Sequence, residues 1–266
     1  MARPVIALLT DFGNKDHYVG TVKGVILGIC PDASCVDITH EVPSHDVLAG
    51  ALELAASYRF FPPGTVFLVV VDPGVGSARR PIAAEAGTYR FVAPDNGVLT
   101  LVFKETAPRR VVELTERRYA RPTVSQTFEG RDRFGPAAAW LAKGIELGAL
   151  DRPIASWYRI EVPDPAVTDH EIVAEVLRVD RFGNLVTNLD RATFDRFAEA
   201  GPFEIVAGTH VVRKVIATYA EGEPGAVCAL FGSSDHLEVA VNGDSAAVQL
   251  ALGRGARILV SRTQGT

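Results

Sequence analysis

The chain has 266 residues, of which 47% are hydrophobic and 22% charged, and its formal net charge is −5. This composition is typical of a globular protein and excludes a disordered chain, and the acidic balance gives no electrostatic footprint for nucleic acid. The longest apolar runs, at residues 5–9 and 66–71, are far shorter than the roughly 20 residues of a membrane helix. We therefore predict a protein that binds neither nucleic acid nor a membrane.

The cysteines and the N-terminal segment predict the cellular compartment. Cys30, Cys35 and Cys228 form neither a Cys-x-x-Cys pair nor an even disulfide framework. The first apolar run is too short for the core of a signal peptide. We expect a cytoplasmic protein with free thiols.

Strand-like and helix-like segments alternate over the first half of the chain. The strand-like segments are mostly apolar, as expected of strands buried on both faces, and the helix-like segments have apolar residues at helical spacing. In chain order they are a strand at 5–9, a helix at 18–29, a strand at 34–38, a helix at 47–58, a strand at 66–71 and a helix at 131–143. This alternation predicts an α/β domain over residues 1–165 with a central, mostly parallel sheet.

Short β-branched segments follow a linker-like stretch of prolines and acidic residues. They recur at intervals of roughly ten residues with turn residues between them, which is typical of small antiparallel barrels and sandwiches. The segments are 172–179, 185–189, 203–206, 211–216, 226–231, 237–241 and 257–260. We predict a smaller, antiparallel β-barrel-like domain over residues 166–266.

Charged residues follow two predicted strands of the first domain. Asp11 comes directly after the first strand, at the edge where open α/β sheets bind ligands, and Asp72 follows the strand at 66–71. The glycine-containing turn at 73–76 could fold Arg79 back onto Asp72. Both residues also have a structural interpretation, Asp11 as a helix cap and Asp72 as part of an ion pair that braces a turn.

Other charged and polar groups are weaker signals. The segment at 127–132 is dense in charge, but it could simply begin the helix that follows. Polar residues at 180–184 and 232–234 lie at strand ends, where turns favour them in any case. The histidines show no metal-ligand spacing, so no metal site is predicted.

Five short motifs nevertheless occur in one order along the chain. They are Thr-Asp-Phe-Gly at 10–13, Asp-Pro-Gly-Val-Gly at 72–76 with Arg79, Pro-Asp-Asn-Gly at 94–97, Thr-Phe-Glu-Gly-Arg-Asp at 127–132, and Phe-Gly-Asn at 182–184 with Thr187 and Asn188. Together they resemble the S-adenosylmethionine (SAM) hydrolase family, the SAM hydroxide adenosyltransferases, which are related to fluorinating and chlorinating enzymes. The resemblance implies an α/β domain followed by a β domain, in a homotrimer with active sites between neighbouring subunits.

The resemblance also implies a reaction. Water or hydroxide attacks C5′ of S-adenosyl-L-methionine, which releases L-methionine and leaves adenosine. The sulfonium is already a good leaving group, so the reaction needs a positioned water and an in-line geometry rather than a general acid. SAM is then the substrate, and no cofactor is expected.

The substrate-binding residues follow from the same resemblance. Asp11 resembles a carboxylate that binds both ribose hydroxyls, and Tyr219 resembles an aromatic residue that stacks on adenine. Asp16, Asp180 and Ser233 are similar to the groups around the amino and carboxylate ends of methionine. The other implied substrate-binding residues are Phe182, Asn184, Ser234, Glu238, Val241 and Gly243.

The residues expected around the nucleophile separate hydrolases from halogenases. Halogenases carry hydroxyl-bearing residues where Asp72 stands, and the fluorinating members have an insertion before 94–97 that this chain lacks. Asp72 and Arg79 resemble the hydrolases, whose third residue is a histidine at the position of Glu129. We predict a hydrolase with the catalytic residues Asp72, Arg79 and Glu129.

The glutamate at position 129 leaves alternatives open. Glu129 could be the base that activates water, or two carboxylates could repel hydroxide and leave a slow enzyme. A protein that binds SAM or adenosine with weak or lost turnover and a SAM-dependent halogenase are alternative functions. A more distant alternative is a metal-dependent hydrolase that uses Asp11, Asp72 and Asp95.

Overall fold

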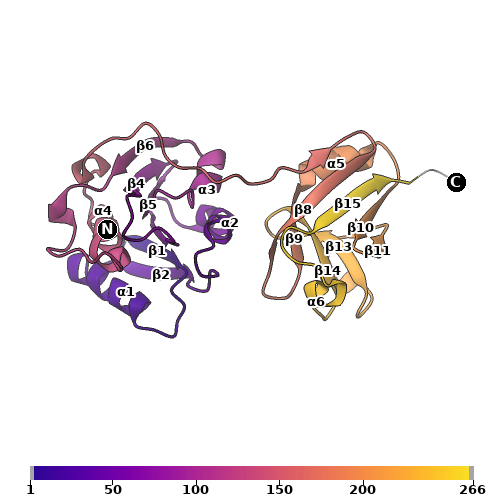
Figure 1. Cartoon of the computed structure of the whole chain (residues 1–266), viewed down its shortest axis with the longest axis horizontal. Coiled ribbons are helices and arrows are strands. Elements are labelled where there is room, and N and C mark those ends of the chain that lie inside the picture. Colours follow the sequence, from indigo (N-terminus) through magenta and orange to yellow (C-terminus); the bar gives the residue numbers. More distant parts are fainter. Residues whose placement is uncertain (1–2, 264–266) are drawn as a thin grey trace. The chain divides into compact units, whose positions relative to one another are not determined.

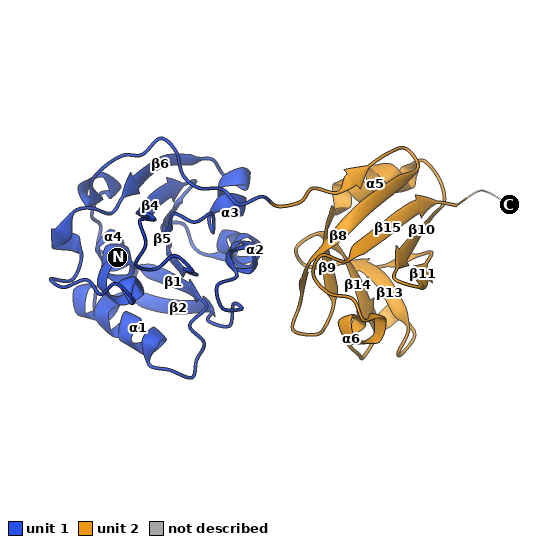
Figure 2. Cartoon of the chain, in the orientation of Figure 1, with its two compact units in different colours: residues 1–161 blue, residues 162–266 orange. Residues whose placement is uncertain are grey.

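The computed structural model describes residues 3–263, which fold into two compact units with their boundary between Glu161 and Val162. Figure 2 colours the two units separately. The boundary lies close to residue 165, where the sequence places the end of the first domain. None of the helices in the described range has the length and hydrophobicity needed to cross a bilayer.

The first unit is built on a mixed, mostly parallel sheet (Figure 1). Its strands are β1 (Val5–Thr10), β2 (Ser34–Thr39), β3 (Val66–Val70), β4 (Pro81–Ala86), β5 (Tyr89–Pro94) and β6 (Pro108–Glu113). Their order within residues 3–161 is β2-β1-β3-β5-β4-β6. The ladders that join β2, β1, β3 and β5 are parallel, and β4 is antiparallel to both of its neighbours. The predicted α/β fold is confirmed.

Helices cover both faces of this sheet. They are α1 (Tyr18–Ile29), α2 (Val47–Ser57), α3 (Thr100–Glu105) and α4 (Gly135–Ala142), with shorter helical turns η1 (Tyr58–Phe60), η2 (Arg117–Tyr119) and η4 (Leu147–Leu150). Ile6 and Leu8 of β1 belong to one core with residues of α1 and α4, and Ala7 and Leu9 belong to another with residues of α2 and α3. Successive side chains of a strand point to opposite faces, so a strand between two helical layers is apolar throughout.

The helix expected at 131–143 begins with a wider turn. Gly130–Phe134 form a π-helical turn, η3, and α4 continues from Gly135. In this turn the backbone N–H of Gly135 bonds to the carbonyl of Gly130, five residues earlier. Single π-helical turns of this kind occur frequently at functional sites.

The second unit is a nearly closed, barrel-like arrangement of mostly antiparallel strands, as predicted (Figure 1). Its strands are β7 (Ala166–Val167), β8 (Glu171–Val179), β9 (Leu185–Asp190), β10 (Phe203–Ala207), β11 (His210–Val212), β12 (Val215–Ile216), β13 (Val227–Phe231), β14 (His236–Val241) and β15 (Arg257–Arg262). Among the residues described, the main order is β11-β10-β15-β8-β9-β14-β13-β12, with β7 paired to β8. Two helices, α5 (Arg191–Glu199) and α6 (Ala246–Leu250), and the helical turn η5 (Tyr219–Glu221) were not predicted.

Candidate active site

The carboxyl ends of β1 and β3 bring Asp11 and Asp72 to one edge of the first sheet. The two strands are parallel neighbours, and Thr10 pairs with Val70 in their register. The residues that follow both strands therefore lie at the carboxyl edge, where α/β sheets bind ligands. A pocket of about 480 Å³ opens there, and both carboxylates line it.

Arg79 lies between Asp72 and a second carboxylate, that of Glu129. Its Nε donates to Oδ1 of Asp72 at 3.0 Å, and its Nη2 donates to Oδ2 of Asp72 and to Oε2 of Glu129. The side chains of Asp72, Arg79 and Glu129 are only 6%, 9% and 11% exposed. Burial disfavours the charged guanidinium, but its bonds to the two carboxylates outweigh burial and raise the pKa of Arg79. The structure thus brings the three predicted catalytic residues together.

Gly76 allows the turn that carries Asp72 and Arg79 to approach the segment before Glu129. Its φ is +77°, in the left-handed region, and a Cβ there would lie 2.6 Å from the carbonyl oxygen of Gln126. A residue with a side chain would be strained by this φ and would clash with that carbonyl. The glycine therefore permits the contact between the two loops on which the charged cluster depends.

Asp132 anchors the loop that carries Glu129. Its side chain is fully buried and accepts bonds from Nε and Nη2 of Arg131, at 2.6 and 2.7 Å, and from the backbone N–H of Ser125 at 2.9 Å. Burial opposes its ionisation, but these bonds hold the pKa of Asp132 below its usual value. The charged motif at 127–132 thus contains a structural aspartate, Asp132, and a glutamate that lines the pocket, Glu129. The sequence alone did not distinguish these two roles.

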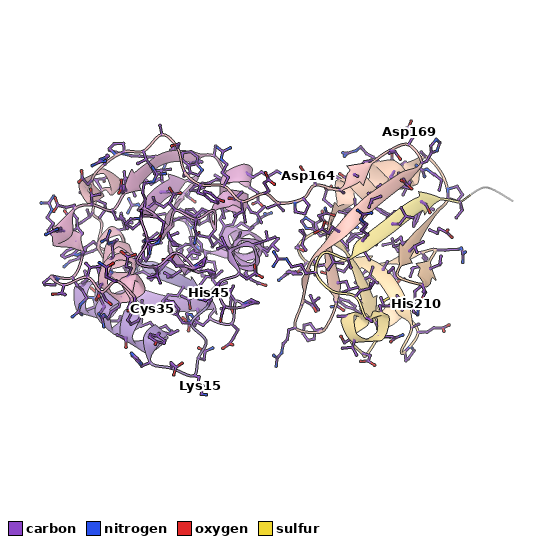
Figure 3. The ribbon with its side chains drawn as sticks, viewed as in Figure 1. Lys15, Cys35, His45, Asp164, Asp169 and His210 are labelled. Carbon is purple, nitrogen blue, oxygen red and sulfur yellow. The ribbon has the colours of Figure 1, made fainter. Side chains whose placement is uncertain are left out.

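Asp11 lines the same pocket together with aromatic residues. Its Oδ2 accepts a bond from the backbone N–H of His45 at 2.8 Å. His45, labelled in Figure 3, lies on the loop between β2 and α2 with a φ of +68°, which residues other than glycine rarely adopt. Phe12, Tyr18 and Phe128 also line the pocket, and the rings of Tyr18 and Phe128 meet edge to face at 5.1 Å. The pocket therefore offers both carboxylates and apolar ring surface to a ligand.

Two acidic residues considered from the sequence have other surroundings. Asp16 is exposed before α1 and is not among the described residues that line this pocket. Asp95 accepts bonds from Nε of Arg80 at 2.9 Å and from the backbone N–H of Tyr158 at 2.7 Å. Residues 3–263 contain no group of three or more His, Cys, Asp or Glu side chains placed to hold a metal ion.

The second unit has a pocket of its own, of about 520 Å³. Its lining residues are Phe182, Asn184, Tyr219, Val241 and Gly243, which were predicted, and Asp244 and Ser245, which were not. The ring of Phe182 is 78% exposed. An exposed aromatic ring beside a mostly apolar pocket can stack on a planar ligand.

A polar network supports this second pocket. Nδ2 of Asn184 donates to Oδ2 of Asp180 at 2.9 Å and to the hydroxyl of Tyr219 at 3.3 Å, and that hydroxyl donates to Oε2 of Glu238 at 2.7 Å. Burial and the Glu238 carboxylate raise the pKa of Tyr219, and burial raises the pKa of Glu238. A Cβ at Gly232 would lie 1.8 Å from Glu238, so the glycine makes room for this carboxylate. The network fixes the hydroxyl of Tyr219 beside the pocket.

The two serines predicted to bind substrate lie on the turn between β13 and β14. Ser233 is exposed, and the carbonyl oxygen of Ser234 lies 2.8 Å from Nδ1 of His236. Neither serine is among the described residues that line the second pocket. The structure thus brings most, but not all, of the predicted binding residues into the two pockets.

The chain therefore combines an α/β unit that has a charged pocket at its carboxyl edge with a β-barrel-like unit that has a second pocket. Residues 6–151 match the SAM hydroxide adenosyltransferase N-terminal domain, and residues 174–259 match the C-terminal domain of the same family. The chain belongs to the SAM hydroxide adenosyltransferase family, as the motifs in its sequence indicated.

Named relatives and solved structures agree with this assignment. The (R)-S-adenosyl-L-methionine hydrolase of Thermus thermophilus is 40% identical, with 95% of this chain and 97% of that protein covered. A fluorinase of Nocardia brasiliensis is 30% identical, with 97% of each covered. An uncharacterized conserved protein from Thermotoga maritima superimposes with a TM-score of 0.90 at 36% identity, over 97% of this chain and 100% of that one.

Proposed function

We propose that this protein hydrolyses S-adenosyl-L-methionine to adenosine and L-methionine. The observation that carries the proposal is the buried cluster of Asp72, Arg79 and Glu129, in which Arg79 joins two carboxylate residues that line a pocket at the carboxyl edge of the sheet. Relatives named (R)-S-adenosyl-L-methionine hydrolase, at 36–40% identity, support it further, because they are more similar to this chain than the fluorinases of Nocardia brasiliensis and Actinoplanes sp., which are 30% identical.

In the proposed reaction the oxygen of a water molecule attacks C5′ of SAM. The C5′–S bond breaks, its electron pair neutralises the sulfonium, and methionine leaves as a thioether. One proton is released in each turnover, and Asp72 or Glu129 is its first acceptor. Arg79 fixes both carboxylates, so that they orient the water in line with the bond that breaks.

Asp11 and the second pocket bind the adenosine portion in this proposal. The N–H of His45 uses one lone pair of Asp11, and the remaining lone pairs can accept both ribose hydroxyls. Tyr219 and Phe182 supply the aromatic surface for adenine. We place the methionine end near Asp16, Asp180 and Ser233.

We also propose a cytoplasmic homotrimer in which one subunit's first unit and its neighbour's second unit form each active site. The arrangement rests on the resemblance to the family, and the proposed residues are divided between the units, with Asp11 and Asp72 in the first and Tyr219 and Ser233 in the second. Light scattering should find three 28.5-kDa chains. An active monomer would contradict the shared site.

Incubation of the purified protein with SAM tests the function directly. Chromatography should detect adenosine and methionine in equal amounts, at the same rate with and without a chelator. The Asp72→Asn variant should lose at least about 100-fold in kcat while its affinity for adenosine stays the same. SAM that binds and is recovered unchanged would instead indicate a binding protein, and a 5′-halogenated nucleoside formed with added chloride or fluoride would indicate a halogenase.

A further inference from the structure

Glu129 contacts a second arginine in addition to Arg79. Nε of Arg133 lies 3.2 Å from Oε1 of Glu129, while Nη2 of Arg79 bonds to Oε2. Each oxygen of this carboxylate therefore has its own guanidinium. The side chain of Arg133 is 30% exposed, so its charge remains partly hydrated, unlike that of Arg79.

The charges of the cluster balance only when Arg133 is included. Asp72 and Glu129 carry two negative charges against one positive charge on Arg79, and all three side chains are buried. An unpaired buried charge is strongly unfavourable, and two carboxylates beside one another repel both each other and a hydroxide-like nucleophile. Arg133 brings the count to two charges of each sign.

Arg133 contacts Glu129 at a second cavity rather than in the ligand pocket. Glu129 directly precedes the π-helical turn η3 and Arg133 lies within it, four residues later. The two residues line a separate polar cavity of about 200 Å³, together with Ser77, Arg79, Ser125 and Gln126. Glu129 lines the ligand pocket as well, whereas Arg133 is not among the described residues that do so. Arg133 can therefore hold the glutamate without occupying the space of a ligand.

We propose that Arg133 is a positioning residue that allows a glutamate at position 129 to take part in catalysis. It neutralises the second carboxylate and fixes its orientation, so that Oε2 stays on Arg79 and the carboxylate faces the reacting water. This inference rests on the proposed hydrolase function. Loss of the Arg133 side chain should lower kcat and leave SAM binding unchanged, because Arg133 contacts Glu129 but is not among the described residues that line the ligand pocket.

A double-mutant cycle between positions 133 and 129 tests the inference. We expect Arg133→Gln to lower kcat about tenfold with a KM for SAM within about twofold of the parent, and Arg133→Lys to recover part of the loss. In a Glu129→His background, where the neutral ring has no charge to balance, the same Arg133→Gln change should alter kcat by less than about twofold. Arg117→Gln removes an arginine that shares a further cavity with Arg133 but is not among the described residues that line the cavity of Glu129, and it should leave kcat unchanged.

The outcomes separate this inference from the function on which it rests. Lack of SAM hydrolysis by the parent protein would refute the proposed function itself. If the parent is active, an equal loss of kcat in both backgrounds, or no loss in either, would overturn the role of Arg133. Thermal unfolding of the four proteins of the cycle (the parent, Arg133→Gln, Glu129→His and the double variant) measures the contribution of the ion pair to stability independently of turnover. Coupling in stability with none in kcat would make the pair structural and would also overturn the proposal.

Discussion

Replacement of Arg79 by glutamine would leave Asp72 and Glu129 as buried carboxylates without the guanidinium between them. Each hydrogen bond to a charged group contributes about 1.5–3 kcal/mol, and loss of one partner of a buried ion pair costs about 3–5 kcal/mol. Glu129 keeps its contact with Arg133, and the adjoining polar cavity of about 200 Å³ can admit water. We therefore expect the lower end of the range, a loss of about 3 kcal/mol in the free energy of unfolding.

Intrinsic fluorescence in urea is a suitable assay for the Arg79→Gln variant. The two tryptophans of the chain, Trp140 and Trp157, both lie in the first unit, so their emission follows the unfolding of that unit. Arg59→Gln is the matched control, because Arg59 pairs with Glu105 at the surface and its loss should cost less than about 1 kcal/mol. Addition of Asp72→Asn to Arg79→Gln should restore part of the stability. If the Arg79 variant is as stable as the control, the guanidinium does not hold two buried carboxylates.

Further predictions concern binding, catalysis and pH. Asp11→Ala should weaken adenosine binding by about 1.5–3 kcal/mol in calorimetry, since it removes hydrogen bonds to a charged group; equal affinity would refute the role of Asp11. Glu129→Gln should abolish most SAM hydrolysis and Glu129→His should preserve it, whereas equal rates of Glu129→Gln and the parent at every pH would make the glutamate a bystander. Because the folded state raises the pKa of Glu238, the folded protein binds its proton more tightly, and its stability should fall as the pH rises above the ordinary glutamate value. The Glu238→Gln variant should not lose stability over this pH range, so its stability relative to the parent should be higher at pH 7 than at acidic pH. An unchanged pH dependence of the free energy of unfolding would contradict this.

The parts of the fold that were predicted are those with a strong local pattern. β3 and the first five residues of β1 are apolar because helical layers cover both faces of these strands. β4, β5 and β6 were not predicted, because charged residues such as Glu85, Arg90 and Arg110 interrupt the apolar pattern of these strands. The π-helical turn that directly precedes α4 was also not predicted, because an apolar pattern with a period of 3.6 residues does not reveal a locally wider turn.

The candidate site divides in the same way between local and distant contacts. The contact between Asp72 and Arg79 could be predicted because a short glycine-containing turn joins them. The network of Asn184, Tyr219 and Glu238 joins residues far apart in the chain, so only a family resemblance pointed to these positions. The ion pair between Glu129 and Arg133 has the four-residue spacing of a helix face, but the sequence did not show which of several nearby arginines makes it.

The π-helical turn at Gly130–Phe134 sets where the side chain of residue 129 lies, whereas the residue type at that position sets which functional group is presented. Deletion of one residue from the turn would restore a regular α-helix and rotate the preceding residues by about 100° around the helix axis, carrying position 129 away from Arg79. A substitution at position 129 leaves that backbone path intact and changes only which functional group is presented. Evolution or design can therefore exchange the reactive group at this position without rebuilding the fold, provided that a residue such as Arg133 changes with it.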